Sequence, residues 1–441
     1  MEKQSNIVTL AKMAKKASLK ISTVNSDDKN KLLIAISQRI EQNASRIASE
    51  NKKDTDLAGK MVEQGKLSKP LLERLKLTDA KIRQLSTYLE EVARLEDPVG
   101  KKQYAMKLAE GLELERVTCP IGLIAIIFES RPEVVVQVTA LSLKSGNGVI
   151  LKGGTEAQHS NRILFQIIAE VLTEFGLEHT VNLVETREDV AELLKQDESI
   201  DLIIPRGSNQ FVKYIQDNSR IPVLGHSSGI CHVFVDKYQE NKKTIPIILD
   251  AKLDYPSACN AVETLLVHSE SAQTVLPETI RKLQEKNVIC RGCERTLDIA
   301  KANDLNIERA SNMDWETEYT DLILSIKIVD SLEEAVDHIN TYGSHHTDTI
   351  ITESNESAEY FLVHVDSACV FHNASTRFSD GYVFGLGAEV GISTNKTHSR
   401  GPVGLDGMII YKYLLRGNGH LKASFAGKDA IPFLHIPLPV K

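Results

Sequence analysis

Cys259 lies in a stretch whose residue types are suited to nucleophilic chemistry. The residues just before it, Pro256, Ser257 and Ala258, leave little bulk around the thiol, and a run typical of a buried strand follows directly. In α/β folds, substrates bind at turns beside strand ends, where such a thiol would be accessible. A single cysteine is, however, more often a small buried side chain than a nucleophile. On the residues alone, both interpretations of Cys259 stay open.

Two glycine-containing turns are candidate anion sites. Lys152, Gly153 and Gly154 follow a predicted strand, and Gly207 and Ser208 open a predicted helix. Free backbone amides and the helix dipole favour a phosphate group at such positions. Ordinary turn glycines would show the same spacing, so this interpretation also stays open.

Two other patterns carry less weight. Cys290 and Cys293 form a C-x-x-C pair, but a structural zinc site needs four ligands and the sequence offers no second pair at suitable spacing. We therefore interpret this pair as a coincidence in a surface loop. The glycines in 384–393 resemble a dinucleotide fingerprint, yet they do not lie between an early strand and its helix.

A predicted helix–strand junction gathers two histidines and an aspartate. Ser331 and Glu334 form a capping box at the start of a helix that ends at a glycine, which leaves His345, His346 and Asp348 in the turn before the next strand. This turn could bind a metal ion or an anionic substrate, or it could be purely structural. The residues alone do not distinguish these alternatives.

The elements that must position these residues change in character near residue 116. Residues 1–95 place apolar side chains every three or four positions, which is typical of amphipathic helices. Further on, strand-like runs alternate with helical segments, which predicts a parallel sheet with helices on both faces and a Rossmann-like nucleotide domain. The predicted strands are 117–128, 148–152, 180–185, 201–205 and 221–224, and the predicted helices are 131–146, 156–175, 187–196 and 208–217.

The chain divides into three predicted regions. Residues 1–228 hold the N-terminal helices and the nucleotide-binding domain, and residues 229–395 form a second α/β domain that contains Cys259. Residues 396–441 form a returning segment with one strand and a loose tail. We find no internal repeat and no low-complexity linker.

The composition of the 441 residues, with 42% hydrophobic and 25% charged side chains, is that of an ordinary globular protein. A net charge of −8 argues against nucleic acid and anionic membranes as partners, although a local site can still bind a small anion. The six scattered cysteines are expected to be reduced, because a chain of this size needs no disulfides. Without a signal peptide or a membrane-spanning segment, we expect a cytoplasmic protein.

Long segments of the sequence resemble one known family. They are FESRPEVVVQ, ILKGGTEA, LIIPRGSNQF, VLGHSSGICHVFVD, AKLDYPSACNAVETLLVH, HINTYGSHHTDTI and FHNASTRFSDGYVFGLGAEVGISTNKTHSRGPVGLDG. From about residue 5 to about residue 420, the chain is similar to the γ-glutamyl phosphate reductases, or glutamate-5-semialdehyde dehydrogenases, of the aldehyde dehydrogenase superfamily. The resemblance implies an α/β, aldehyde-dehydrogenase-like fold, with a Rossmann-like cofactor domain, an α/β catalytic domain and a small oligomerisation hairpin and strand.

The resemblance also implies a reaction. It is the NADPH-dependent reduction of L-glutamyl 5-phosphate to L-glutamate 5-semialdehyde and phosphate, the second step of proline biosynthesis from glutamate. Cys259 matches the family's nucleophile, whose thiolate attacks the acyl phosphate to form a thioester. The thioester then accepts hydride from NADPH, and the product collapses to the aldehyde. No metal is expected.

The family's cofactor residues fall on the glycine-containing turns. Lys152, followed by Gly153, matches the lysine that meets the adenosine ribose, and Gly207 with Ser208 matches the pair that meets the pyrophosphate. Glu318 matches the glutamate that holds the nicotinamide ribose. The resemblance therefore implies an NADPH site at these turns.

The substrate residues implied by the resemblance come from two motifs. Ser130 and Arg131 lie where the aldehyde oxidisers of the superfamily place their oxyanion group, so they are candidates for contacting the acyl phosphate or its oxyanion. Asn373, Ser375 and Thr376 are candidates for contacting the glutamyl group or the phosphate.

Two departures from related enzymes bear on the chemistry. Aldehyde oxidisers carry a glutamate that activates water for hydrolysis of the thioester, whereas this sequence has His226 in the corresponding stretch, which favours the reductive direction. Gln158 and His159 stand where several relatives are more basic, which weakens the expected grip on the 2′-phosphate of NADPH. Arg162 or Lys152 would then supply that grip.

The resemblance also bears on partners and alternatives. A hairpin at 105–118 and the strand at 407–417 would assemble a homodimer or a larger homo-oligomer, while the tail at 424–441 has no assigned role. A glutamate 5-kinase is an expected partner.

The alternative functions are an oxidative aldehyde dehydrogenase and an inactive paralogue that binds nucleotide or holds the kinase. The missing glutamate argues against the first, and the retained Cys259 motif argues against the second.

Overall fold

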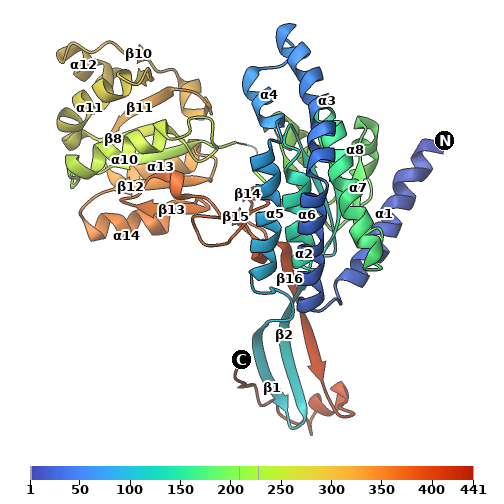
Figure 1. Cartoon of the computed structure of the whole chain (residues 1–441). Coiled ribbons are helices and arrows are strands. Elements are labelled where there is room, and N and C mark those ends of the chain that lie inside the picture. Colours follow the sequence, from blue (N-terminus) through green and yellow to red (C-terminus); the bar gives the residue numbers. More distant parts are fainter. Residues whose placement is uncertain (1, 208, 227, 441) are drawn as a thin grey trace.

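The computed structural model describes residues 2–207, 209–226 and 228–440. Figure 1 shows two α/β units beside each other and a narrow antiparallel sheet that extends away from the first unit. The first unit holds the N-terminal helices and a four-stranded sheet, and the second is built on a seven-stranded sheet. Among the described residues, no helix combines the length and the apolar character needed to cross a membrane.

Five helices form the N-terminal layer of the first unit. Apolar residues recur every three or four positions, so each helix has one face that can be buried. Leu32 and Ile36 of the second helix pack in one core with Leu85 of the fifth. The helices are α1 (Glu2–Ile21), α2 (Ser26–Gln42), α3 (Ala44–Glu63), α4 (Lys69–Leu75) and α5 (Asp79–Arg94).

The sheet of the first unit is parallel, in the order β5-β4-β3-β6. Ile124 and Ile126 face a core shared with α2 and α5, whereas Leu123 and Ala125 face a core shared with α1, so both faces of β3 are covered. The strands are β3 (Leu123–Phe128), β4 (Gly148–Lys152), β5 (Val181–Val184) and β6 (Leu202–Arg206). The helices are α6 (Val134–Lys144), α7 (Gln158–Glu174), α8 (Arg187–Leu193) and α9 (Asn209–Asn218).

The strand predicted at 221–224 is wrong. Only Val223 forms a bridge, with Ile203 of β6. Pro222 has no amide hydrogen to donate, which keeps the segment from joining the sheet as a regular strand. The single strand predicted over 117–128 is also wrong, because Gly122, with φ of 131°, separates two strands there.

The sheet of the second unit is parallel, in the order β10-β9-β11-β8-β7-β12-β13. Every residue of β7, β8 and β12 is buried, as expected for central strands covered by helices. The strands are β7 (Cys231–Val235), β8 (Val262–His268), β9 (Ile289–Gly292), β10 (Glu308–Arg309), β11 (Ile323–Val329), β12 (Thr347–Ile351) and β13 (Cys369–His372). The helices are α10 (Asn241–Leu253), α11 (Ser269–Gln284), α12 (Glu294–Ala302), α13 (Leu332–Tyr342) and α14 (Asn355–His364).

The strand order of this sheet brings three distant segments together. Strand β7 lies between β8 and β12, and all three run in the same direction. The residues that precede these strands therefore meet at one edge of the sheet. Cys259 precedes β8, His346 directly precedes β12, and the segment that contains His226 precedes β7.

A third sheet joins the segment 102–120 to the C-terminal part of the chain. Strand β2 (Leu112–Pro120) pairs antiparallel with β1 (Lys102–Ala109) on one side and with β16 (Ile409–Arg416) on the other. The tail returns to the same sheet, where β17 (Ile436–Pro437) pairs with β1. The hairpin and the C-terminal strand that the sequence analysis singled out therefore belong to one sheet.

The chain returns to the first unit earlier than the predicted boundary at 395. Ala388 and Val390 belong to the hydrophobic core of the first unit, together with Val403 and Met408. The short strands β14 (Gly391–Ser393) and β15 (Gly401–Val403) form a hairpin within this return. The glycine-rich stretch 384–393 thus leads into a returning hairpin and is not a dinucleotide loop between a strand and a helix.

A buried ion pair flanks the turn that carries Cys259. The ammonium of Lys252, at the end of α10, lies 2.7 Å from the carboxylate of Glu263, at the start of β8, and both side chains are almost fully buried. Lys252 also donates to the carbonyl of Val262 (3.0 Å), and Glu263 accepts from the amide of Thr320 (3.1 Å). Burial raises the pKa of Glu263 and lowers that of Lys252, while each charge opposes the shift of the other.

We predict that Lys252→Met destabilises the protein by about 3–5 kcal/mol, because it leaves the Glu263 carboxylate buried without its partner. The double variant Lys252→Met/Glu263→Gln should recover part of the loss, since glutamine is neutral and can still accept from Thr320. Urea unfolding measures both effects. Lys243→Met is a matched control, because this exposed lysine of α10 pairs with Glu353 at the surface and should contribute no more than about 1 kcal/mol. Equal effects of Lys252→Met and Lys243→Met would contradict the prediction.

Candidate active site

The turn between α10 and β8 presents Cys259. The amide of Ala258 donates to the carbonyl of Tyr255 (3.0 Å), and the amide of Ala261 donates to that of Ala258 (3.0 Å), so the backbone is tightly turned on both sides of the cysteine. Gly229 lies against this turn. A Cβ atom at Gly229 would lie 2.2 Å from the carbonyl oxygen of Cys259, so only glycine fits there.

His346 is the hydrogen-bonding partner of the thiol. Its Nε2 lies 3.2 Å from Sγ of Cys259, and its Nδ1 lies 2.8 Å from the hydroxyl oxygen of Thr347. If Nδ1 donates to Thr347, Nε2 is free to accept the thiol proton. His346 is fully buried, whereas Cys259 as a residue is only partly buried.

Both members of this pair are electrically neutral in the free protein. Burial raises the pKa of the Cys259 thiol to about 12, the negative charges of Glu318 and Glu389 add to that shift, and the positive charge of Arg377 opposes it. Burial also holds the pKa of His346 well below its usual range, and the neighbouring His226 acts in the same direction. The resting site is therefore a thiol beside a neutral imidazole rather than an ion pair.

Arg377 and Asn260 anchor the nucleophile turn to the segment that follows β13. The side-chain amide of Asn260 donates to the carbonyl of Ser379 (2.9 Å). The guanidinium of Arg377 donates to Asp254 (3.0 Å), just ahead of the turn, and lies over the ring of Tyr255. Arg377 is thus a cation close to the thiol that the sequence analysis did not select.

The structure separates Asn373 from the predicted substrate site. Asn373 follows the carboxyl end of β13, and its side chain accepts from the amide of Thr352 (3.0 Å) and donates to the carbonyl of the same residue (2.9 Å). Cys259 lies at the opposite edge of the sheet, so we withdraw Asn373 as a substrate contact. Ser375 and Thr376 lie nearer the amino edge of the sheet, where Cys259 lies, but both side chains are almost completely buried.

Two sequence motifs take different roles in the structure. Of the three predicted turn residues His345, His346 and Asp348, only His346 faces the thiol. His345 contacts the carbonyl of Asp366 (2.6 Å), and Asp348 contacts the buried His232 (2.9 Å). The three residues therefore form no joint site. The surface-loop interpretation of the C-x-x-C pair is also wrong, because Cys290 is a buried residue of β9.

A cavity of about 1030 Å³ lies beside the carboxyl ends of β3 and β4 and is also lined by α3. Lys152 and Ser130 line it, together with Lys60 and His159. The hydroxyl and the amide of Ser130 donate to Glu156 (2.7 and 2.6 Å), which is also part of the lining. Ser130 therefore faces this cavity, and its described hydrogen bonds are to Glu156 rather than to the thiol.

The glycines at this edge are required by close contacts. A Cβ atom at Gly153 would lie 2.1 Å from the side-chain nitrogen of Asn161, and one at Gly207 would lie 2.7 Å from the carboxylate of Glu129. The space beside both glycines is thus filled by protein side chains, and Gly154 is the glycine of this edge that lines the cavity. Ser208 lies outside the described residues.

Glu318 reaches from the second unit to the first. Its carboxylate accepts a hydrogen bond from the side-chain amide of Asn209 (2.6 Å), the first residue of α9. Glu318 also raises the pKa of Cys259. Glu318 thus connects the second unit to the start of α9 in the first unit.

Arg131 lines a second cavity, of about 630 Å³, together with Arg83, Arg206 and Glu389. The pKa of Arg206 is lowered by burial and by the positive charge of Arg131. Glu389 raises the pKa of the Cys259 thiol, so this cavity is close enough to the nucleophile for electrostatic influence. An anionic group bound there would relieve the repulsion between the arginines.

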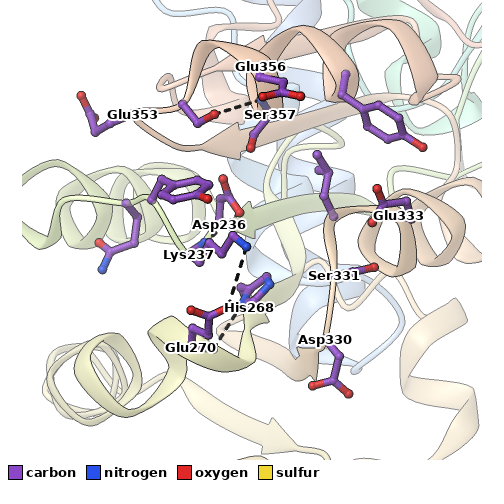
Figure 2. A pocket seen from close by; sticks show the side chains of 15 residues that line it. Asp236, Lys237, His268, Glu270, Asp330, Ser331, Glu333, Glu353, Glu356 and Ser357 are labelled. Atoms are coloured by element: carbon purple, nitrogen blue, oxygen red, sulfur yellow. Dashed lines mark hydrogen bonds and ion pairs between the residues drawn. The ribbon is translucent and has the colours of Figure 1, made fainter.

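Figure 2 shows a further pocket, of about 750 Å³, at the other edge of the seven-stranded sheet. Asp236 follows β7, His268 ends β8 and Asp330 follows β11, so the pocket lies at the carboxyl ends of these strands. Neither Cys259 nor His346 is among its lining residues. The reactive edge of this sheet is therefore its amino edge.

We predict that alkylation of Cys259 by iodoacetamide accelerates steadily with pH in the free protein. With a thiol pKa of about 12, the thiolate fraction rises roughly tenfold per pH unit between about pH 7 and about pH 10. Mass spectrometry of the peptide that contains Cys259 measures the rate, with Cys259→Ser as the control for assignment. A plateau below about pH 8 would indicate a thiolate–imidazolium pair and contradict the neutral pair.

Comparison with known proteins identifies the family of the chain. The family model described as "Aldehyde dehydrogenase family" matches residues 2–299. The "Gamma-glutamyl phosphate reductase" of Natronomonas pharaonis is 51% identical over 422 residues, which cover 96% of this chain and 95% of the relative. That of Methanococcoides burtonii is 50% identical and covers 97% of this chain and 96% of the relative. The crystal structure of "Gamma-glutamyl phosphate reductase" from Thermotoga maritima superposes with a TM-score of 0.90 at 38% identity, over 94% of this chain and 99% of that one. The chain therefore belongs to the aldehyde dehydrogenase family and, within it, to the family of the gamma-glutamyl phosphate reductases.

Proposed function

We propose that this protein reduces L-glutamyl 5-phosphate to L-glutamate 5-semialdehyde with NADPH, through a thioester on Cys259. The observation that carries the proposal is the Cys259 thiol, 3.2 Å from the buried imidazole of His346, in a chain similar to these reductases over nearly its full length. A thiol with an adjacent base is the arrangement needed for covalent acyl transfer.

Cys259 and His346 act together in the first step. The thiol sulfur attacks the acyl carbon while its proton passes to Nε2 of His346, and the bond to the phosphate oxygen breaks. Because the free thiol and imidazole are both neutral, the proton moves during the attack and not before it. Phosphate is a good leaving group, so the attack does not require a thiolate formed in advance.

NADPH would be held in the larger cavity, which Lys152 lines, and by residues beside it. Lys152 and the turn at Gly153 would hold the adenosine end, Gly207 and the start of α9 the pyrophosphate, and Glu318 the nicotinamide ribose. When bound, the cofactor supplies the hydride that reduces the thioester carbonyl. His226 supports this outcome, because it stands where aldehyde oxidisers carry the glutamate that activates water.

The cavity of arginines would bind the charged parts of the substrate. L-Glutamyl 5-phosphate carries a phosphate, an α-carboxylate and an α-ammonium group. Arg131, Arg83 and Arg206 would bind an anionic group, and Glu389 and Asp380 on the same cavity would favour the ammonium group. We therefore retain Arg131 as a substrate contact and place Ser130 with the cofactor cavity.

The preference for NADPH over NADH would come from Lys60, with Lys152 and His159. All three line the cofactor cavity, and Lys60 comes from α3, which the sequence analysis did not connect with the cofactor. Arg162 is a weaker candidate, because its guanidinium donates to both carboxylate oxygens of Glu185 (3.1 and 2.9 Å).

The third sheet would provide the contact between subunits of a homodimer or a larger homo-oligomer. Strand β16 is the outer strand of that sheet and exposes Tyr411, Tyr413 and Leu415. An outer strand with unpaired backbone groups can pair with a second copy.

A glutamate 5-kinase, which phosphorylates the side-chain carboxylate of glutamate, would supply the substrate.

The reverse reaction tests the proposed function, since it avoids the labile acyl phosphate. Purified protein with pyrroline-5-carboxylate, phosphate and NADP⁺ should form NADPH, followed by absorbance, and formation should depend on phosphate. Cys259→Ser should lower the rate by about 10⁴-fold or more, because the nucleophile is lost. NADPH formation without phosphate would instead indicate a hydrolytic aldehyde dehydrogenase, and no formation at all would favour a binding protein.

We predict that Lys60→Ala raises the KM for NADPH about tenfold, because one charge-assisted contact to the 2′-phosphate is lost. The KM for NADH should hardly change, since NADH has no such phosphate. Lys52→Ala, at an exposed position of the same helix outside the cavity lining, is the matched control. Equal changes for the two cofactors would assign Lys60 a role other than phosphate recognition.

A further inference from the structure

Three side chains with strong affinity for transition metals converge at the nucleophile. One ligand atom each from His226, Cys259 and His346 lies within 4.8 Å of the others. Around a tetrahedral zinc ion, a sulfur ligand at about 2.3 Å and a nitrogen ligand at about 2.0 Å lie roughly 3.5 Å apart. The observed 3.2 Å between Sγ of Cys259 and Nε2 of His346 is already close to that separation.

The surroundings of both histidines favour metal binding. Nδ1 of His226 lies 2.9 Å from the carbonyl oxygen of Ile392 and donates to it, which leaves Nε2 with a free lone pair. Nδ1 of His346 is occupied in the same way by Thr347. Outer contacts of this kind fix the tautomer and the orientation of a metal-binding histidine. The two rings stand at 80° to each other with centroids 5.2 Å apart, so they approach the thiol from different directions.

We propose that His226, Cys259 and His346 form a binding site for Zn²⁺ that reversibly blocks the nucleophile. The ligand set of one thiolate and two imidazoles suits zinc, and the fourth position would hold water. On binding, the S–H bond of Cys259 breaks, a sulfur–zinc bond forms and one proton leaves to solvent, with no change in oxidation state. The bound sulfur lone pair can no longer attack an acyl carbon. That consequence, unlike metal binding itself, rests on the proposed function.

The position of His226 distinguishes this site from the catalytic pair. Proton transfer in the proposed reaction needs only Cys259 and His346, whereas a stable metal site needs the third ligand. His226 comes from the segment ahead of β7, which crosses from the first unit to the second. Metal binding would therefore join the nucleophile to the connection between the units.

Cobalt titration of the full-length, reduced protein tests the site directly. Co²⁺ alone should bind with one equivalent and produce the near-ultraviolet thiolate-to-cobalt absorption band, and Zn²⁺ should remove the band by displacement. His226→Ala should weaken cobalt binding about 100-fold or more, and Cys259→Ala should abolish the band. His345→Ala is the matched control, because this neighbouring histidine faces Asp366 and should leave the band unchanged.

Protection of the thiol provides the second readout. Zn²⁺ should prevent alkylation of Cys259 by iodoacetamide in the unaltered protein, a chelator should restore it, and His226→Ala should remain unprotected. Circular dichroism establishes that each variant is folded. The absence of a thiolate band, a band retained after Cys259→Ala, or an unchanged cobalt affinity after His226→Ala would overturn the proposal. Because these readouts need no substrate, they remain valid whether or not the proposed reaction is found.

Discussion

The parallel register of β8, β7 and β12 is the constraint on which the active site depends. Because the three strands run together, the segments ahead of them meet at one edge of the sheet, although Cys259 and His346 are far apart in the sequence. Gly229 then allows the backbone ahead of β7 to lie directly against the nucleophile turn. A reversed strand would carry its residue to the other edge, where the pocket of Figure 2 lies.

Burial gives this edge its chemical character. The same desolvation raises the pKa of the thiol and lowers that of the imidazole, so neither group carries charge until an acyl group is present. Thiolates, and not thiols, are the species that oxidants attack most readily. The site therefore keeps its nucleophile reduced between turnovers, and the buried pair of Lys252 and Glu263 holds the turn in place beneath it.

Local pattern predicted the helices of 1–95, most strands of the first sheet and the turn of Cys259, because these depend on nearby residues. It could not predict that His346 meets Cys259, since this depends on the order of strands in the sheet. Pattern also could not predict the separation of Asn373 from Cys259. Asn373 lies at the carboxyl edge of the sheet, and a later residue of its motif, Ser379, contacts Asn260 beside the nucleophile. Pro222 could have excluded the strand at 221–224, because proline cannot donate to a ladder.

The third sheet has a consequence for the order of folding. Strand β2 finishes at Pro120 and its partner β16 begins at Ile409, so the whole second unit lies between two paired strands. Pairing two strands so far apart in the sequence costs chain entropy, because a long loop must be closed, and such a pairing forms slowly. During synthesis on the ribosome, β2 must wait for almost the entire chain to emerge, and the first hairpin stays without its neighbour until then. Among the described sheets, this one is thus the last to have all of its strands synthesised, after every strand of the two parallel sheets.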